Sequence, residues 1–154
     1  MKHETYKGKS VLIAGLESRE PLDFNFPFPK SFLALAVYRA RNSPHAKPFK
    51  MGSVIFKRAK IISSGFNSYN DSVITKLSPC FYKYPGAIHA EMDSILRAKE
   101  AVCGCSMLVV RINGKGNFRM AKPCYYCQDL LHHVKIKKVF YSNGKETIFD
   151  SIVM

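Results

Sequence analysis

Four side chains in the second half of the chain are of types that bind metal ions or move protons. His89 and Glu91 are separated by one residue, and Cys124 and Cys127 by two, with a proline directly before the first cysteine. Cysteines three positions apart at the start of a helix point their sulfur atoms to one place, because such positions share a helix face. The free amides and positive end of that helix also favour the thiolate, which is the form that binds a metal. One imidazole and two thiolates therefore make a candidate set of metal ligands.

The number of ligands indicates which kind of zinc site this set would form. A catalytic zinc ion (Zn²⁺) takes three protein ligands and keeps a fourth position for water, whereas a structural zinc ion closes that position with another side chain. Zinc lowers the pKa of the bound water toward neutrality and so creates a hydroxide nucleophile. Glu91 lies two residues after His89, close enough to take the proton of that water without binding the metal itself. The pattern favours a hydrolytic zinc site.

The two cysteines also have other interpretations. A redox pair of cysteines needs no accompanying His-x-Glu segment. A structural zinc site would need a fourth ligand, for which Cys80, Cys103 and Cys105 are candidates, and it would leave Glu91 without a purpose. Cys103 and Cys105 flank a glycine just before an apolar run, where cysteine is also common as a small core residue. These interpretations compete with the catalytic one.

The length of 154 residues fits one domain of ordinary size. We expect an irregular N-terminal arm over residues 1–30 and a single domain over residues 31–154. No apolar run is long enough to span a bilayer, and the basic start is followed too soon by charge for a secretory signal. The sequence therefore predicts a cytoplasmic protein that does not bind membranes. Its five cysteines are an odd number, which excludes a disulfide framework that uses all of them.

The net charge of +13 has two explanations. A nucleic acid or a phosphorylated substrate would be attracted by the summed positive field. A bias of the source proteome toward lysine would give the same charge without such a function. The basic residues that could hold phosphates are Lys47, Lys50, Lys57, Arg58, Lys60, Lys115, Arg119 and Lys122. As solvated charge they need no function, so both explanations stay open.

Helices are predicted where the candidate ligands lie. Apolar residues at helical spacing predict a helix from about 88 to 101, and Pro123 suits the first turn of a helix that follows it. An earlier helix is expected from about Ser31, near its cap, to the residues before Pro44. Each ligand-bearing segment would thus open a helix.

Strands are predicted between and after these helices. Residues 51–57 and 61–66 form two strand-like runs joined by a tight basic turn, and the apolar run 106–112 is typical of a strand buried on both sides. A glycine-bearing basic excursion follows over 113–122. Near the C-terminus, Asn-Gly between two strand-like runs indicates a hairpin. Within the arm, one short strand is considered over Val11–Leu16. The order of elements predicts an α/β protein with three layers, α/β/α, around a mixed central sheet that ends in a β-hairpin.

Two segments of the chain resemble the cytidine and deoxycytidylate deaminase superfamily. They are residues 88–96 (IHAEMDSIL) and 123–127 (PCYYC), which contain the His-x-Glu and Pro-Cys-x-x-Cys patterns of zinc-dependent nucleobase deaminases. The resemblance covers roughly residues 31–142. It implies that residues 31–154 form a single zinc-dependent deaminase domain. It also implies a cytidine deaminase-like fold with both zinc helices on one side of the sheet, and subunits that associate as homo-oligomers. It further implies that Asn67 touches the sugar or base and that the backbone around Ala90 contacts the ring.

The chain also departs from the usual pattern of this superfamily. The excursion over 113–122 lengthens the gap between the two motifs, and Ala121 and Lys122 precede the proline where many relatives carry Thr-Leu-Glu or similar residues. A C-terminal hairpin is typical of relatives that act on free cytidine. Those relatives usually bind zinc through a cysteine where this chain has His89. The chain thus combines features of two branches.

Three hypotheses about function follow. In the first, the protein hydrolyses a cytosine base in a nucleoside or nucleotide of the cytidine or dCMP type. Zinc hydroxide would attack C4, Glu91 would deliver protons to N3 and the departing amine, and ammonia would be released. In the second, the same chemistry acts on a base in RNA or single-stranded DNA, as the net charge of +13 suggests. In the third, the chain is a non-catalytic binding module whose zinc has four protein ligands.

Overall fold

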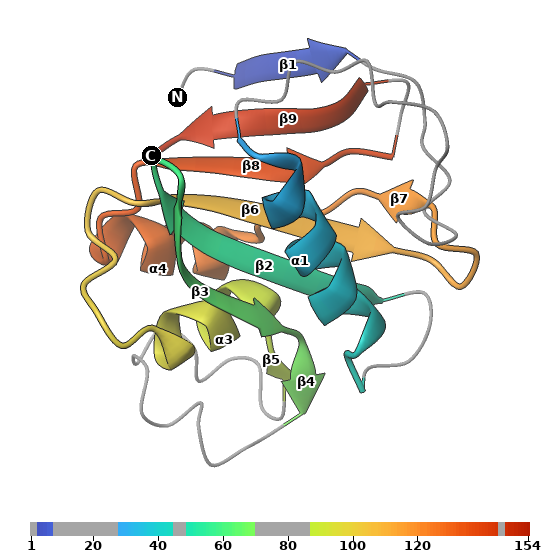
Figure 1. Cartoon of the computed structure of the whole chain (residues 1–154), viewed down its shortest axis with the longest axis horizontal. Helices are drawn as coiled ribbons and strands as arrows, with labels where there is room; N and C mark the ends of the chain where they lie inside the picture. Colours follow the sequence, from blue (N-terminus) through green and yellow to red (C-terminus); the bar gives the residue numbers. More distant parts are fainter. Residues whose placement is uncertain (1–2, 8–27, 45–48, 70–86, 145–146) are drawn as a thin grey trace.

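A central β-sheet organises the described part of the chain, which in this computed structural model comprises residues 3–7, 28–44, 49–69, 87–144 and 147–154 (Figure 1). The strands of this sheet are β1 (His3–Lys7), β2 (Lys50–Lys57), β3 (Lys60–Phe66), β6 (Ser106–Ile112), β7 (Phe118–Arg119), β8 (Lys138–Ser142) and β9 (Thr147–Val153). A separate two-stranded ladder consists of β4 (Ser68–Tyr69) and β5 (Ala87–Ile88), and the helices are α1 (Lys30–Arg41), α3 (Ala90–Arg97) and α4 (Tyr125–His133).

The central sheet mixes parallel and antiparallel pairing. Its strands follow the order β1-β9-β8-β6-β2-β3, with β7 paired to β6 outside this path. β6 and β8 run parallel, whereas β2 is antiparallel to both β3 and β6, and β9 is antiparallel to both β1 and β8. α4 lies between β6 and β8 in the chain, as a crossover between parallel strands requires. The mixed sheet and the C-terminal hairpin of β8 and β9 are therefore confirmed.

Helices cover both faces of the sheet, and the alternation of side chains along β6 explains how. Leu108 and Val110 pack in one apolar cluster with residues of α1, whereas Met107 and Val109 pack in a second cluster that contains Leu131 of α4. Successive side chains of a strand point to opposite faces, so the two clusters lie on opposite sides of β6. Figure 1 shows α1 in front of the sheet and α4 behind it. The predicted three-layer architecture is confirmed.

The close packing of α1 on β2 depends on a glycine. A Cβ atom at Gly52 would lie 2.0 Å from the carbonyl oxygen of Ala36 and 2.6 Å from the amide nitrogen of Ala40. Both alanines are completely buried, so the helix and strand approach each other through small residues. α1 begins at Lys30, directly after Pro29 and one residue before its predicted start.

The N-terminal stretch contributes a strand that the sequence analysis missed. β1 pairs with β9 in antiparallel fashion, with Tyr6 opposite Phe149. The irregular conformation predicted for residues 1–30 is therefore wrong at this segment, because pairing with β9 supplies backbone hydrogen bonds that the short polar run HETYK does not signal. The strand considered over Val11–Leu16 lies outside the described residues. The boundary between arm and domain stays a prediction.

α3 is shorter than the helix predicted over residues 88–101. Ile88 belongs to β5, and His89 has extended backbone angles, φ −76° and ψ 156°, so the helix begins at Ala90. At the other end, Ala98 leaves the helical conformation with ψ 125°. In the part of the chain that the structure describes, no helix has the length and apolarity needed to cross a membrane.

The excursion over residues 113–122 contains a strand that composition did not indicate. β7 folds back on β6, with Arg119 opposite Arg111. Asn113 organises the intervening turn, since its side-chain oxygen accepts hydrogen bonds from the backbone amides two and four residues later, at 3.0 and 2.9 Å. Phe118 is buried in the same apolar cluster as α1. The excursion is therefore a packed extension of the central sheet.

Candidate metal centre

Two helix N-termini bring the three predicted ligands together. His89 is the residue directly before α3, Cys124 is the residue directly before α4, and Cys127 lies in the first turn of α4. Their ligand atoms all lie within 4.8 Å of one another. Nδ1 of His89 is 3.6 Å from Sγ of Cys124 and 3.2 Å from Sγ of Cys127. One nitrogen and two sulfur atoms therefore surround a space of the size that a metal ion requires.

The donor set fits zinc with an open coordination position. Zinc binds imidazole nitrogen and thiolate sulfur at about 2.0–2.3 Å, so the distances of 3.6 and 3.2 Å from the His89 nitrogen to the two sulfur atoms allow one ion to contact all three. Among the described residues, no fourth His, Cys, Asp or Glu joins this group. Cys105 packs instead in the apolar cluster beside α4, and Cys103 is exposed. Cys80 lies outside the described residues.

The two thiols differ in their affinity for a proton. The hydrogen bond with Cys127, supported by His89 and opposed by burial, lowers the pKa of Cys124 to about 4. The same hydrogen bond, together with burial, raises the pKa of Cys127 well above its usual value. The hydrogen bond with Cys124 raises the pKa of His89, while burial opposes this shift. Of the two thiols, Cys124 therefore loses its proton more readily.

Glu91 is a buried carboxyl group beside these ligands. It is the second residue of α3 and is only 1% exposed. Burial raises the pKa of its carboxyl, and the neighbouring His89 opposes that shift. Its Oε2 atom is buried and has no hydrogen-bond partner in the structure. A buried oxygen without a partner is rare in folded proteins, so this atom is available to a water molecule or ligand at the centre.

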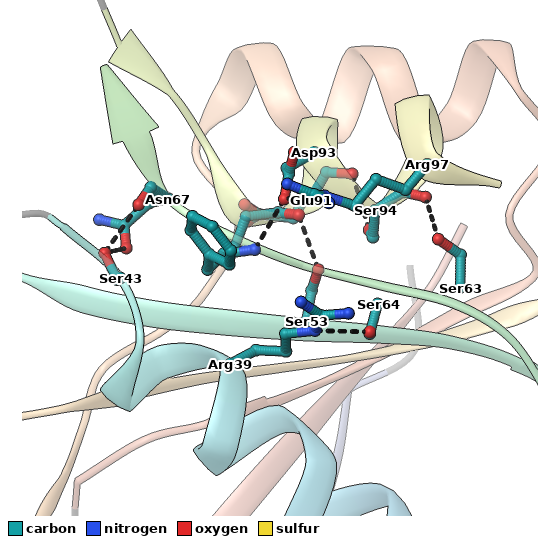
Figure 2. Close-up of polar contacts among 12 residues, drawn as sticks. Arg39, Ser43, Ser53, Ser63, Ser64, Asn67, Glu91, Asp93, Ser94 and Arg97 are labelled. Atoms are coloured by element: carbon teal, nitrogen blue, oxygen red, sulfur yellow. Dashed lines mark hydrogen bonds and ion pairs between the residues drawn. The ribbon is translucent and has the colours of Figure 1, made fainter. Parts of the chain in front are cut away.

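Serine hydroxyls hold the first turns of α3 against the sheet (Figure 2). Ser53 of β2 donates a hydrogen bond of 2.6 Å to the carbonyl oxygen of Ala90, and Ser63 of β3 donates one of 2.7 Å to the carbonyl oxygen of Ser94. Ser94 in turn donates to the carbonyl oxygen of Glu91 at 2.9 Å. Ala90 is completely buried. These bonds fix the backbone that carries Glu91, and the sequence analysis did not identify the serines that make them.

Asp93 ties α3 to the end of β3. Its Oδ2 atom accepts a hydrogen bond of 3.0 Å from the amide of Phe66 and forms an ion pair with Arg97 at 2.8 Å. Gly65 makes this approach possible, because a Cβ atom there would lie 2.5 Å from the amide nitrogen of Ser94. Figure 2 shows Asp93 and Arg97 on the side of α3 that faces β3. A buried carboxylate and a glycine thus set the distance between helix and strand.

Asn67 is buried close to the start of β2. Its side-chain oxygen accepts hydrogen bonds from the hydroxyl of Ser43 at 2.7 Å and from the amide of Met51 at 2.8 Å. Its side-chain nitrogen donates to the carbonyl oxygen of Phe49. Asn67 therefore stabilises the entry into β2. Its contact with a sugar or base, like the contact of the Ala90 backbone with the ring, stays a prediction.

Comparison with known proteins agrees with this fold and this cluster. Residues 28–143 match the family described as the cytidine and deoxycytidylate deaminase zinc-binding region. The match covers most of the chain and includes all three candidate ligands and Glu91. The chain therefore belongs to the cytidine and deoxycytidylate deaminase family, whose shared region binds zinc.

Individual relatives carry names of the same family, and a solved structure shares the fold. The deoxycytidylate deaminases of Mus musculus and Homo sapiens are each 27% identical to this chain in an alignment of 127 residues that covers 77% of this chain and 66% of each relative. The matched part thus spans just under two thirds of their length. The apo structure of dCMP deaminase from the cyanophage S-TIM5 has a TM-score of 0.52 at 19% identity, covering 74% of this chain and 81% of that protein. That likeness demonstrates a shared fold.

Proposed function

We propose that this protein hydrolyses the exocyclic amine of a cytosine base in a nucleoside or nucleotide and releases ammonia. His89, Cys124 and Cys127 would hold the zinc ion. The observation that carries the proposal is a cluster of three ligand atoms within 4.8 Å of one another, beside a buried Glu91 oxygen that has no partner. Membership of the deaminase family supports the reaction class.

Glu91 would move the protons of this reaction. Bound zinc supplies an acidified water molecule as the nucleophile. Oε2 of Glu91 would accept a proton from that water and deliver protons to N3 of the base and then to the departing amine. Burial raises the pKa of this carboxyl, which suits a group that must take up and release a proton near neutral pH.

The backbone of α3 and the side chain of Asn67 would position the substrate. Ser53 holds the carbonyl group of Ala90, which supports a role for the peptide at the start of α3 in contacting the ring. Asn67 is held by Ser43 and by the backbone of β2. A nucleotide substrate is supported by the relatives named deoxycytidylate deaminase and by the cyanophage S-TIM5 enzyme, which was solved in complex with dCMP and dUMP.

A substrate panel with a matched pair of variants tests this proposal. Zinc-loaded protein would be incubated with nucleosides, mononucleotides and oligonucleotides, and ammonia and base conversion would be measured. We expect turnover of a cytosine substrate by the wild type and a loss of at least about 100-fold in Glu91→Gln, because general acid–base catalysis contributes about 10²–10⁴-fold. Zinc content should be unchanged in this variant.

The control is Asp129→Asn, which makes the same chemical change at an exposed carboxylate of α4. It should keep full activity. Normal deamination by Glu91→Gln would refute the proton-transfer role of Glu91. Absence of ammonia release from every cytosine substrate in the panel would refute the proposed activity.

A further inference from the structure

Two arginines lie opposite each other at the end of β6. Arg111 and Arg119 are register partners in the β6–β7 ladder, and such partners project their side chains to the same face of the sheet. Arg111 follows Met107 and Val109 at alternate positions of β6, so all three side chains point to the same face of the strand. Met107 and Val109 pack on that face in the apolar cluster beside α4. Both arginines therefore belong to the face that carries the candidate metal centre. Like charges placed directly opposite each other repel, so an anion between them would stabilise the pair.

Strand register connects Arg111 to the α3 side of the metal centre. Met51 is the partner of Arg111 in the β2–β6 ladder, and the amide of Met51 donates a hydrogen bond of 2.8 Å to the side-chain oxygen of Asn67. Asn67 directly precedes β4, which pairs with β5 immediately before His89. A series of paired or adjacent residues thus connects Arg111 to His89 through the central sheet and the separate β4–β5 ladder.

Arg119 is connected to the α4 side of the same centre. The hydroxyl of Ser142 donates to the carbonyl oxygen of Arg119 at 2.7 Å and accepts the backbone N–H of Arg111 at 3.0 Å. The amide of Ala121 donates to the carbonyl oxygen of Ser142 at 2.8 Å. The chain then reaches the ligand Cys124, five residues after Arg119. β8 therefore fixes the backbone of both arginines relative to the start of α4.

The two guanidinium groups have different surroundings. The guanidinium of Arg111 lies 4.8 Å from the centre of the Phe49 ring, a stacking that restricts its orientation. Phe49 also accepts the side-chain N–H of Asn67 through its carbonyl group. Arg119 is exposed and forms no ion pair with any described residue. The guanidinium of Arg111 is thus oriented before a ligand binds, and the exposed guanidinium of Arg119 is accessible to a ligand.

The basic residues of the β2–β3 turn lie far from this position. Lys57 and Lys60 are register partners at the β2–β3 turn. The preceding residue Phe56 pairs with Ser106, the first residue of β6, so the turn lies beside the start of β6. Lys60 also forms an ion pair with Glu100 at 3.1 Å. The turn therefore lies at the opposite end of β6 from Arg111, and its charges serve as a control.

We propose that Arg111 and Arg119 bind the phosphate group of a pyrimidine nucleoside 5′-monophosphate whose base lies at the candidate metal centre. This inference rests on the deamination proposed above and narrows its substrates to nucleotides. A phosphate monoester carries about two negative charges at neutral pH, which two guanidinium groups balance. Each guanidinium also offers parallel N–H donors in the spacing of two phosphate oxygens.

The decisive quantity is the preference for nucleotide over nucleoside. We would measure kcat/KM for deoxycytidine and its 5′-monophosphate, and for cytidine and its 5′-monophosphate, in the wild type and in Arg119→Gln. The ratio of nucleotide to nucleoside kcat/KM should fall by about tenfold or more in the variant, as the loss of a charge-assisted hydrogen bond implies. Lys57→Gln, which removes one positive charge at the far turn, should keep the wild-type ratio.

Direct binding separates this inference from the proposed activity. Calorimetric titration of deoxycytidine 5′-monophosphate into zinc-loaded Glu91→Gln, with and without Arg119→Gln, reports phosphate binding without turnover. Arg111→Lys keeps the charge but loses the paired donors and should also weaken binding. If no substrate is deaminated and binding still depends on Arg119, the activity is refuted and the phosphate site stands.

Two other results would overturn the phosphate site or its assignment to a free nucleotide. If the wild type deaminates cytosine substrates with the same nucleotide preference as Arg119→Gln, the phosphate site is overturned and the activity stands. If a single-stranded oligonucleotide binds more tightly than the monophosphate, and this binding depends on Arg119, the assignment to a free nucleotide is overturned. Thermal unfolding of Arg119→Gln should match the wild type, because this side chain is exposed.

Discussion

His89 and Cys124 occupy equivalent positions, since each is the residue directly before the first turn of its helix. The helix ends that meet here carry partial positive charge, which favours thiolates over thiols. The pKa of Cys124, lowered to about 4 chiefly by its hydrogen bond with Cys127, agrees with this environment. A metal ion would displace protons from these side chains, because ligands must be deprotonated to bind it. The cluster is therefore built to exchange protons for a cation.

A single sulfur atom should decide whether zinc binds. Cys124→Ser removes one of three ligands and should lower the zinc content from about one ion per chain to a small fraction of that value, because three protein ligands are the usual minimum for a catalytic site. Cys103→Ser is the matched control, since Cys103 is an exposed free cysteine outside the cluster. Metal content would be measured by mass spectrometry after dialysis. Full zinc content in Cys124→Ser would contradict the ligand assignment.

At the scale of elements, α3 is attached to the sheet by buried polar contacts. Ser53, Ser63 and Asp93 all bond across the interface between α3 and the β2–β3 pair. A carbonyl group such as that of Ala90 needs a partner when buried, because an unsatisfied group costs about 1–3 kcal/mol. The position of Glu91 therefore depends on Ser53 and Ser63, which belong to strands much earlier in the chain.

Removal of one of these hydroxyls should weaken the attachment of α3. Ser53→Ala leaves the Ala90 carbonyl without its 2.6 Å partner and should lower the free energy of unfolding by about 1–3 kcal/mol. It should also reduce kcat while zinc stays bound. Ser106→Ala, at a half-buried serine of β6, should change stability by less than about 0.5 kcal/mol. Urea denaturation of both variants provides the comparison, and equal stabilities would contradict the role of Ser53.

Elements with strong local patterns could be predicted from the sequence, whereas elements that depend on distant partners could not. The run 106–112 and the helix after Pro123 were predicted because apolar periodicity and proline placement are local signals. β1 and β7 were missed, because their short polar or glycine-bearing runs become strands only through pairing with β9 and β6. The contacts of the serines that hold α3 could not be predicted, since nothing in the local sequence relates Ser53 to Ala90.

At the scale of the whole molecule, the family match and the sheet have different extents. The match covers residues 28–143, whereas β1 and the C-terminal strand β9 lie outside it and form one edge of the sheet. The candidate ligands, Glu91 and the β6–β7 ladder lie within it. A third apolar cluster joins Met92 of α3 to Leu130 of α4 and includes the candidate ligand Cys127. Packing and metal binding thus connect the same two helices.

Zinc should therefore stabilise the whole domain as well as the site. A ligand that binds only the folded state at about 1,000 times its dissociation constant adds about 4 kcal/mol of stability. For a chain of this size each kcal/mol corresponds to about 2–4 °C, so a chelator should lower Tm by about 8–16 °C. Scanning calorimetry of the zinc-loaded and chelated protein would measure the shift, and readdition of zinc should reverse it. Cys124→Ser should show almost no response to either treatment. If the wild type unfolds at the same temperature with and without zinc, the ion does not join α3 to α4, and its assignment to His89, Cys124 and Cys127 is wrong.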